Sequence, residues 1–385
     1  MNYKRVCCLW LIFIYLFTFI FLSGCWNYRE IEDLSIVTGA AVDKEDDQFR
    51  LTVEIVNIEG GSNAKVASSI ITSYGATMFE ASRNAINILG KRLYWSHTTL
   101  IVLSEQIAKE GLVPVLDWLA RDPEIRQTLN IVVSKEKTAH EIFHLPHPVF
   151  NVISFDLDNI FQNQGSVSKT PDGEEWKVLK NLATPGLDLV LPVALLFMSE
   201  GQLIPTFSGT AVFKKDRLKG YLSPDETRIF MFIKDEIKTG LLTNNVIQED
   251  VPVKVTLEII DNKTKMKPVI KGENIVMRIS TITNVSIAEI EGRALDTGEE
   301  GSMELAGQFE DMLQEDIKNL VMHVQKEFGC DIFGFGNAIR MEYPDVWKEI
   351  ESDWDRLFQS IEVVTESQVH IENTALSSKP IIVRD

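Results

Sequence analysis

The chain has 385 residues, of which 45% are hydrophobic and 24% are charged, values typical of folded globular proteins rather than disordered ones. Acidic residues outnumber basic residues by 56 to 38, which gives a formal net charge of −18. This balance disfavours nucleic-acid binding and electrostatic adhesion to anionic lipid, because clustered lysine and arginine supply most of both affinities.

The N-terminus reads as an export segment. Lys4 and Arg5 precede residues 6–23, which are uncharged and almost wholly apolar, and the run ends in Leu-Ser-Gly-Cys at residues 22–25. Eighteen helical residues rise about 27 Å, so length alone does not separate a cleaved signal peptide from a retained membrane helix. The ending resembles the bacterial lipobox, in which small residues enter a peptidase and the thiol is acylated. We therefore expect residues 1–24 to be removed between Gly24 and Cys25, and Cys25 to carry S-diacylglycerol and an N-acyl chain.

The four cysteines agree with this interpretation. Cys7 and Cys8 lie in the segment expected to be removed, Cys25 would carry lipid, and Cys330 is the one thiol left. The mature chain then has no intramolecular disulfide, although it is exported, and core packing must hold the fold together.

Strands and helices alternate in the next part of the chain. Residues 35–43 and 49–57 read as a hairpin, and further strands are expected at 68–75, 98–105 and 128–135. Amphipathic helices are expected at 76–92, 111–122 and 138–145. Such alternation predicts βαβ units and a mixed sheet. The polar stretch 162–175 is interpreted as a surface loop, and strands follow over 188–209.

The C-terminal half groups its strands and then its helices. A hairpin is expected at 209–222, followed by a helix with Ser223 as its N-cap and Pro224 at its first position. Residues 251–261, 265–282 and 283–292 are expected to be strands of a meander. The longest helix covers 302–329 with Gly329 as its stop, and a helix at 344–359 precedes a strand at 361–373. We therefore expect a mixed α/β N-terminal region over 25–205, in one or two subdomains, and an α+β C-terminal domain over 206–385.

One motif suggests catalysis. Residues 140–144 read His-Glu-Ile-Phe-His, the H-E-x-x-H pattern in which two histidines bind zinc and the glutamate acts as general base. Pro146 and Pro148 end the helix after one turn, and the pattern lacks an evident third ligand. The zinc-hydrolase hypothesis is therefore set beside a plain alternative, a short amphipathic helix with Ile142 and Phe143 turned inward.

The remaining motifs have ordinary structural interpretations. The glycine-rich stretch 334–339 is expected to be a tight turn into a helix rather than a phosphate loop. Cys330 is expected to be a small buried hydrophobe, and Trp347, Trp354 and Phe358 form a stripe typical of a core-facing helix. No cofactor or metal site is assigned, so the residues favour an exported, membrane-tethered binding or assembly protein rather than an enzyme.

Three stretches resemble the Ger(x)C family of spore-germination lipoproteins. They are residues 24–43, which open with Gly-Cys-Trp, residues 209–228, and residues 330–358. The resemblance implies the non-catalytic C subunit of a nutrient germinant receptor, lipid-anchored on the outer face of the spore inner membrane beside two integral-membrane subunits. Cys25 alone carries over with a defined chemical role. The alternative is a lipid-anchored solute-binding protein that captures a nutrient directly.

Overall fold

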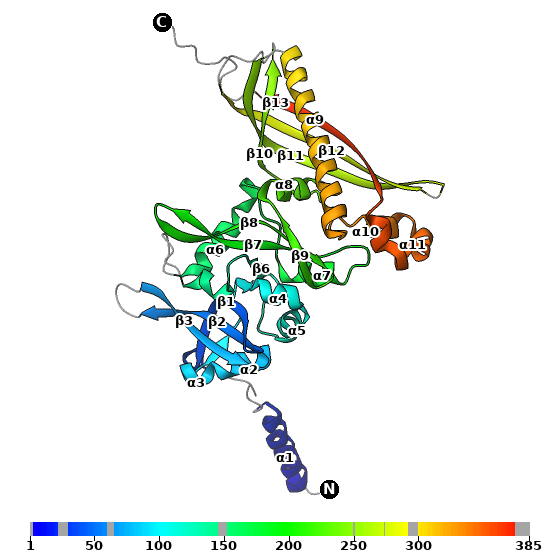
Figure 1. Ribbon diagram of the computed structural model, residues 1–385. Coiled ribbons are helices and arrows are strands. Elements are labelled where there is room, and N and C mark those ends of the chain that lie inside the picture. Colours follow the sequence, from blue (N-terminus) through cyan, green and yellow to red (C-terminus); the bar gives the residue numbers. More distant parts are fainter. Residues whose placement is uncertain are drawn as a thin grey trace.

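The computed structural model describes residues 3–21, 30–59, 65–144, 152–248, 251–272, 274–291 and 299–373. Helix α1 (Tyr3–Phe21) comes first. Within the described residues from Glu30 onward, the chain forms a nine-stranded N-terminal sheet and a four-stranded C-terminal sheet (Figure 1). The α/β and α+β fold classes expected from the sequence are confirmed.

The N-terminal sheet is mixed. Its strands are β1 (Leu34–Glu45), β2 (Gln48–Glu59), β3 (Lys65–Gly75), β4 (Arg92–Tyr94), β5 (Leu100–Leu103), β6 (Asn130–Ser134), β7 (Val190–Ser199), β8 (Gln202–Lys214) and β9 (Arg217–Leu222). The order across the sheet is β3-β2-β1-β5-β6-β7-β8-β9, and β4 pairs with β1 outside this path. Strands β1, β5, β6 and β7 run parallel, whereas hairpins at both ends add antiparallel strands. The predicted βαβ units are thus present.

Helices cover both faces of this sheet, which explains why its central strands are apolar on both sides. On β1, Val37 and Val42 belong to one core cluster and Ala41 to another. The helices that contribute to the first cluster are α2 (Met78–Asn84), α4 (Glu105–Glu110), α5 (Val113–Arg121) and α7 (Glu175–Leu182). The second cluster is closed by a 3₁₀ helix (Ala139–Phe143) and by α6 (Ile153–Gln162).

Three local predictions need correction. The helix expected at 76–92 is two helices, α2 and α3 (Ile86–Leu89), with Ala85 between them. The stretch 162–175 is a surface segment only in part: residues 165–167 are exposed, but Ser168 and Thr170 are buried, and the Ser168 hydroxyl donates to the Thr239 carbonyl at 2.6 Å. The strand expected over 265–282 is interrupted by a turn at Gly272.

The C-terminal sheet has the order β10-β11-β12-β13. Its strands are β10 (Gly240–Gln248), β11 (Val251–Lys271), β12 (Asn274–Glu291) and β13 (Glu362–Asn373). The first three form an antiparallel meander, but not from the strands expected, because β10 was not predicted and the expected breaks after residues 261 and 282 lie inside β11 and β12. Strand β13 pairs with β12 in parallel. A parallel partner needs a long crossover, and the helical segment between residues 299 and 358 supplies it.

The crossover begins with α9 (Glu299–His323), which lies along the C-terminal sheet (Figure 1). Phe309, Leu313 and Ile317 on its inner stripe are fully buried, and a π-helical turn (Val324–Phe328) leads to Gly329 in the left-handed conformation, the expected stop. Three short helices complete the crossover: α10 (Phe335–Glu342), α11 (Pro344–Ile350) and α12 (Trp354–Phe358).

Helix α8 (Pro224–Ile233) joins the two sheets. Its N-terminus has the predicted Ser223 cap, completed by Glu226 as a capping box, and its Phe230 and Phe232 are buried in the C-terminal core. Residue 205 lies inside β8, so strands from both sides of the expected boundary share the N-terminal sheet. The division into 25–205 and 206–385 remains a prediction.

Candidate functional site

The predicted lipidation site, Cys25, and the predicted cleavage point after Gly24 lie outside the residues that the structure describes. The lipid anchor therefore remains a prediction. The apolar run before it forms α1, on which Trp10 and Phe13 are exposed. Across the part of the chain that is described, no helix is long and apolar enough to cross a membrane.

The H-E-x-x-H pattern lies on the 3₁₀ helix Ala139–Phe143 and its C-cap. The His140 and His144 rings lie with their centroids 3.6 Å apart and their planes tilted by 34°, and His140 Nδ1 lies 3.0 Å from the Thr52 hydroxyl. Burial, with smaller contributions from His144 and Arg50, lowers the pKa of His140 to about 4. The described residues hold no group of three metal-ligating side chains, and His147 lies outside them. Ile142 and Phe143 are buried, as the plain alternative expected.

Two buried carboxylates on neighbouring strands hold the two helices that close the second core cluster, the 3₁₀ helix at 139–143 and α6. Asp43 on β1 accepts hydrogen bonds from the main-chain N–H groups of Ala139 and His140, at 2.7 and 3.0 Å. Glu54 on β2 accepts from the N–H groups of Ile153 and Ser154, both at 2.8 Å. Each carboxylate satisfies the unpaired donors at a helix N-terminus, so both acids have structural partners rather than a catalytic arrangement.

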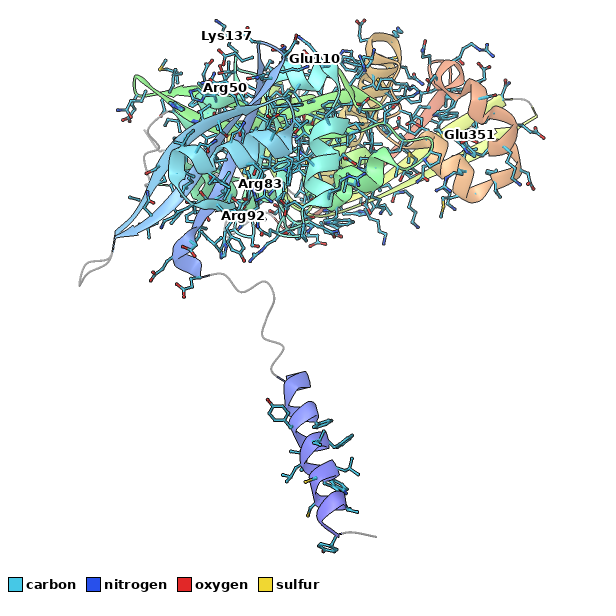
Figure 2. All side chains as sticks on the ribbon, turned by 90° about the horizontal axis from the view of Figure 1, so that it is seen from below. Arg50, Arg83, Arg92, Glu110, Lys137 and Glu351 are labelled. Atoms are coloured by element: carbon cyan, nitrogen blue, oxygen red, sulfur yellow. The ribbon has the colours of Figure 1, made fainter. Side chains whose placement is uncertain are left out.

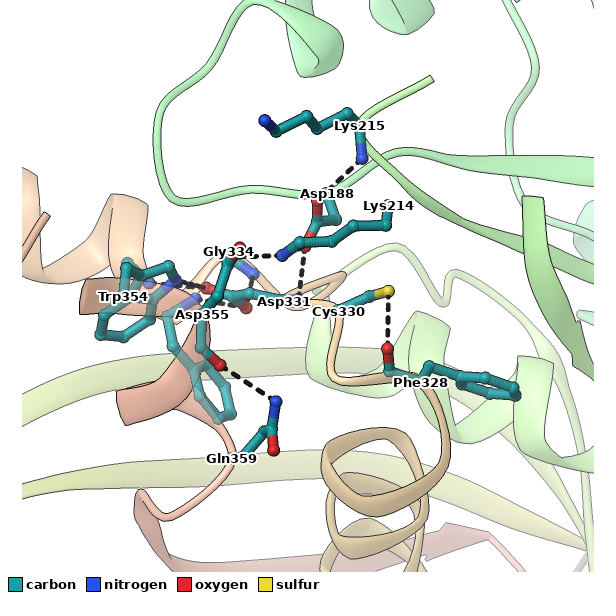
Figure 3. Close-up of polar contacts among 12 residues, drawn as sticks. Asp188, Lys214, Lys215, Phe328, Cys330, Asp331, Gly334, Trp354, Asp355 and Gln359 are labelled. Carbon is teal, nitrogen blue, oxygen red and sulfur yellow. Dashed lines mark hydrogen bonds and ion pairs between the residues drawn. The ribbon is translucent and has the colours of Figure 1, made fainter. Parts of the chain in front are cut away.

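A polar junction connects the two sheet units (Figure 3). Asp331, just before α10, accepts hydrogen bonds from the N–H groups of Gly334, Phe335 and Gly336 at 2.8–3.0 Å, and from Trp354 Nε1 at 3.2 Å. Burial raises the pKa of Asp331 to about 6, against the opposing effect of these donors. The glycine-rich stretch is therefore wrapped around a carboxylate, and it opens a helix as predicted.

The other side of the junction comes from the N-terminal sheet. Asp188, before β7, accepts a hydrogen bond from the Asp331 N–H and donates its own N–H to the Asp331 carbonyl, both at 2.8 Å. Lys214 at the end of β8 bridges Asp188 at 2.9 Å and Asp355 at 2.6 Å. Charged and main-chain groups thus fix α10 and α12 to the end of the N-terminal sheet.

The predicted aromatic stripe and thiol lie next to this junction. Trp347, Trp354 and Phe358 are buried, and the rings of the two tryptophans pack edge to face at 5.4 Å. Cys330 is fully buried, and burial raises the pKa of its thiol to about 12. Both were expected to be core elements, and this prediction is confirmed.

A cavity of about 740 Å³ lies between the two sheet units, and we call it the central cavity. It is lined by the segments that precede β5 and β6, by α6, by the stretch 164–174, by α7 and by the end of α8. Lining residues used below are Thr98, Asn130, Phe161, Thr170, Lys177 and Glu236. Cavities of this size at a domain junction are where small-molecule sites usually occur.

A second groove, of about 940 Å³, lies between α2 and α5. Arg83 and Arg92, both labelled in Figure 2, are among its lining residues. The Arg83 guanidinium lies 4.9 Å from the Phe79 ring centroid, and Arg92 pairs with Glu124 at 3.0 Å. These cationic groups already have partners within the chain.

Sequence reasoning missed the central cavity and the junction. Asp188 and Asp331 are 143 positions apart, and each looks like an ordinary turn aspartate in the sequence. The stretch 162–175 looked polar and therefore exposed, but it pairs with β6 through the N–H of Ile131 and the carbonyl of Gly173 at 2.8 Å. A usable indication was Asp331 followed by Gly334 and Gly336, since an Asp before a glycine-rich turn often accepts its N–H groups.

Comparison with known proteins supports a single family over almost the whole chain. Residues 27–195 match the family described as the spore germination protein N-terminal domain. Residues 208–375 match the spore germination B3/GerAC-like C-terminal domain. The chain belongs to the Ger(x)C family of spore germination proteins. This membership gives it a role in spore germination, as the stretches 24–43, 209–228 and 330–358 indicated.

Individual members of the Ger(x)C family align along most of their length. The chain is 27% identical to spore germination protein KC of Bacillus subtilis over 95% of this chain and 96% of that protein. It is 25% identical to spore germination protein B3 of the same organism, over 89% of this chain and 91% of that protein. The crystal structure of the GerBC protein matches with a TM-score of 0.57 at 22% identity, covering 89% of this chain and 100% of that one, which supports the fold.

Proposed function

We propose that the chain is the lipid-anchored, non-catalytic subunit of a spore nutrient germinant receptor. It would be held by Cys25 on the outer face of the spore inner membrane and would act by assembling with two integral-membrane subunits. The observation that carries this proposal is the match of both Ger(x)C domains, one after the other, from residue 27 to residue 375.

The geometry supports a binding or assembly role better than catalysis. The buried carboxylates of Asp43, Glu54 and Asp331 all accept main-chain hydrogen bonds that cap or enclose helices. The buried thiol of Cys330 is disfavoured as a thiolate by its raised pKa. The junction at Asp188 holds the two sheet units in one arrangement, as a subunit that presents a fixed surface to partners requires.

Co-purification tests the proposal. A C-terminally tagged chain would be recovered from detergent-solubilised spore membranes, and its partners identified by mass spectrometry. We expect both integral-membrane subunits in the eluate, and we expect Cys25→Ala to reduce their recovery because the chain would no longer be held at the membrane. Recovery of the tagged wild-type chain without either subunit would contradict the proposal.

A second candidate function is direct capture of a solute, and the central cavity is the observation that favours it. Its discriminating measurement is a ligand-dependent rise in melting temperature, since a molecule that binds only the folded state stabilises it.

A further inference from the structure

The floor of the central cavity carries polar side chains whose hydrogen-bonding capacity is not used by the protein. Asn130 is 9% exposed and Thr170 is 3% exposed, and both line the cavity. Among the described residues, neither Asn130 Oδ1 nor Thr170 Oγ1 has a hydrogen-bond partner, and the same holds for Oε1 of Gln164, another lining residue. Buried polar atoms are almost always paired, so three such atoms around one cavity indicate groups arranged for something bound there.

The segment that presents these atoms is held firmly. Ser168 donates to the Thr239 carbonyl at 2.6 Å, and the Gly209 N–H donates to the Lys169 carbonyl at 2.9 Å. Asn130 itself forms a bridge with Glu174 through the main chain. The unpaired side-chain atoms are therefore fixed by a main-chain network on both sides, and the site is preorganised rather than left loose.

The charged side chains around the cavity have ion-pair or hydrogen-bond partners within the protein, or are exposed to water. Lys177 pairs with Asp172 and with Glu174, the latter at 3.1 Å. Asp158 accepts a hydrogen bond from Gln162 at 2.8 Å, and Asp235 accepts one from the Thr264 N–H at 2.6 Å. Desolvation raises the pKa of Glu236 above its ordinary value, although this residue remains exposed to water. Arg126 and Lys238 also line the cavity, but both are exposed, and water can solvate them.

The buried lining atoms that have no partner among the described residues, Asn130 Oδ1, Gln164 Oε1 and Thr170 Oγ1, all belong to neutral groups. An amide offers donors and an acceptor, a hydroxyl offers one donor and accepts, and neither compensates a buried charge. Phe161 adds an aromatic wall, held by edge-to-face packing on Phe207 at 5.2 Å. The hydroxyl groups of a hydroxyl-rich molecule would bond the polar side chains, and its C–H groups would pack against the Phe161 ring.

We propose that the central cavity binds a small, uncharged, hydroxyl-rich molecule, a monosaccharide or a cyclic polyol, with Asn130 and Thr170 as its buried hydrogen-bonding groups. This site does not depend on assembly with membrane subunits. The chain can bind such a molecule whether or not the receptor proposal is correct.

The test is thermal unfolding of the full chain in detergent with glucose, myo-inositol or sorbitol as neutral probes. The charged probes are succinate, a dianion, and glycine, a zwitterion that carries both charges. Polyols stabilise proteins without binding, so the decisive feature is a rise in Tm that saturates with concentration. We expect at least one neutral probe to give such a rise and the charged probes to give none. No saturable rise with any neutral probe, or a saturable rise with a charged probe alone, would overturn the proposal.

Two variants and a matched control make the result specific. Thr170→Val removes a hydroxyl that bonds to no described residue, so we expect the ligand-free Tm to be kept or raised and binding to weaken at least tenfold. Asn130→Asp keeps the side-chain shape and should also lose the saturable rise. Thr210→Val is the control, because the Thr210 hydroxyl lies outside the cavity and bonds Thr227 at 2.8 Å. It should lower the ligand-free Tm and keep the ligand response, whereas an unchanged response in Thr170→Val would overturn the assignment.

Discussion

The main-chain N–H of Asp331 donates a hydrogen bond to the carboxylate of Asp188 at 2.8 Å, and the N–H of Asp188 donates to the Asp331 carbonyl at the same distance. Two segments 143 positions apart are thus joined by a reciprocal pair. Asp331 continues the network into α10 and α12, and Lys214 continues it into β8. This junction fixes how the two sheet units meet, and the first predictions concern it.

Replacing Asp331 by Asn should destabilise the fold strongly. Each carboxylate oxygen of Asp331 accepts from two donors, so an amide NH2 would face two donors in either orientation. We expect the free energy of unfolding to fall by about 2–4 kcal/mol, measured by urea unfolding. Asp353→Asn is the control, since Asp353 pairs with Arg356 at the surface. Equal effects of the two substitutions would contradict the role given to Asp331.

Gly186→Ala tests the close approach of two segments of the chain at the junction. Gly186 has φ +70°, and a Cβ there would lie 2.5 Å from the Gly336 carbonyl carbon. Gly201 has a similar φ of +81° with no atom within 4 Å of its Cβ position. Gly201→Ala should lower the free energy of unfolding by about 1–2 kcal/mol, because an alanine is strained in the left-handed conformation. Gly186→Ala adds a steric clash and should lower it by about 3–4 kcal/mol. If both glycines tolerate alanine equally in urea unfolding, the packing described here is wrong.

His140 should make stability sensitive to mild acid. Its folded-state pKa of about 4 lies below the ordinary value of 6.5, so between these pH values the unfolded chain binds more protons. The free energy of unfolding should therefore fall as pH drops from 6.5 to 4. The full shift corresponds to about 3 kcal/mol, and partial exposure reduces our expectation to about 1–2 kcal/mol.

The variant His140→Asn isolates this contribution, because an amide can still bond the Thr52 hydroxyl but does not titrate. The loss of stability between pH 7 and 4.5 should be smaller in this variant than in the wild type. His370→Asn, at an exposed position on β13, should leave the pH profile unchanged. A His140→Asn profile that follows the wild type at every pH would refute the account.

Cys25→Ala should abolish lipid attachment and leave the fold intact. We expect labelled palmitate to enter the wild-type chain but not this variant, and Cys7→Ala, a change within the segment expected to be removed, to be labelled as the wild type is. Unfolding curves of the Cys25 variant should match the wild type, since the predicted chemistry resides in the lipid alone. Labelling that persists without Cys25 would disprove the anchor.

Local patterns in the sequence predicted most elements, because their determinants lie close together. The Ser223 cap, the 209–222 hairpin and the Gly329 stop each depend on a few neighbouring residues, and the structure confirms all three. The parallel pairing of β13 with β12 was not predictable in this way. It joins Val276 to Glu362 across the whole helical crossover, and a hydrophobic pattern carries no information on partner choice at that separation.

The candidate sites depended even more on distant contacts. Thr170 looked like part of a polar loop, but it is buried, and its segment bonds to β6 at Gly173 and to the Thr239 carbonyl at Ser168. The H-E-x-x-H pattern misled in the opposite direction, because it suggested a zinc site. Its residues lie on a 3₁₀ turn whose His140 contacts Thr52. Spacing alone suggested chemistry there, and the surrounding contacts indicate a structural role.

The central claim is that this Ger(x)C protein works as a subunit of a membrane receptor. Its most direct test is the composition of the complex recovered with the tagged chain from solubilised spore membranes, analysed by mass spectrometry alongside an untagged control. Our account predicts that two integral-membrane germination proteins co-elute specifically with the tagged chain. A chain that is recovered alone from membranes in which those proteins are present would contradict it.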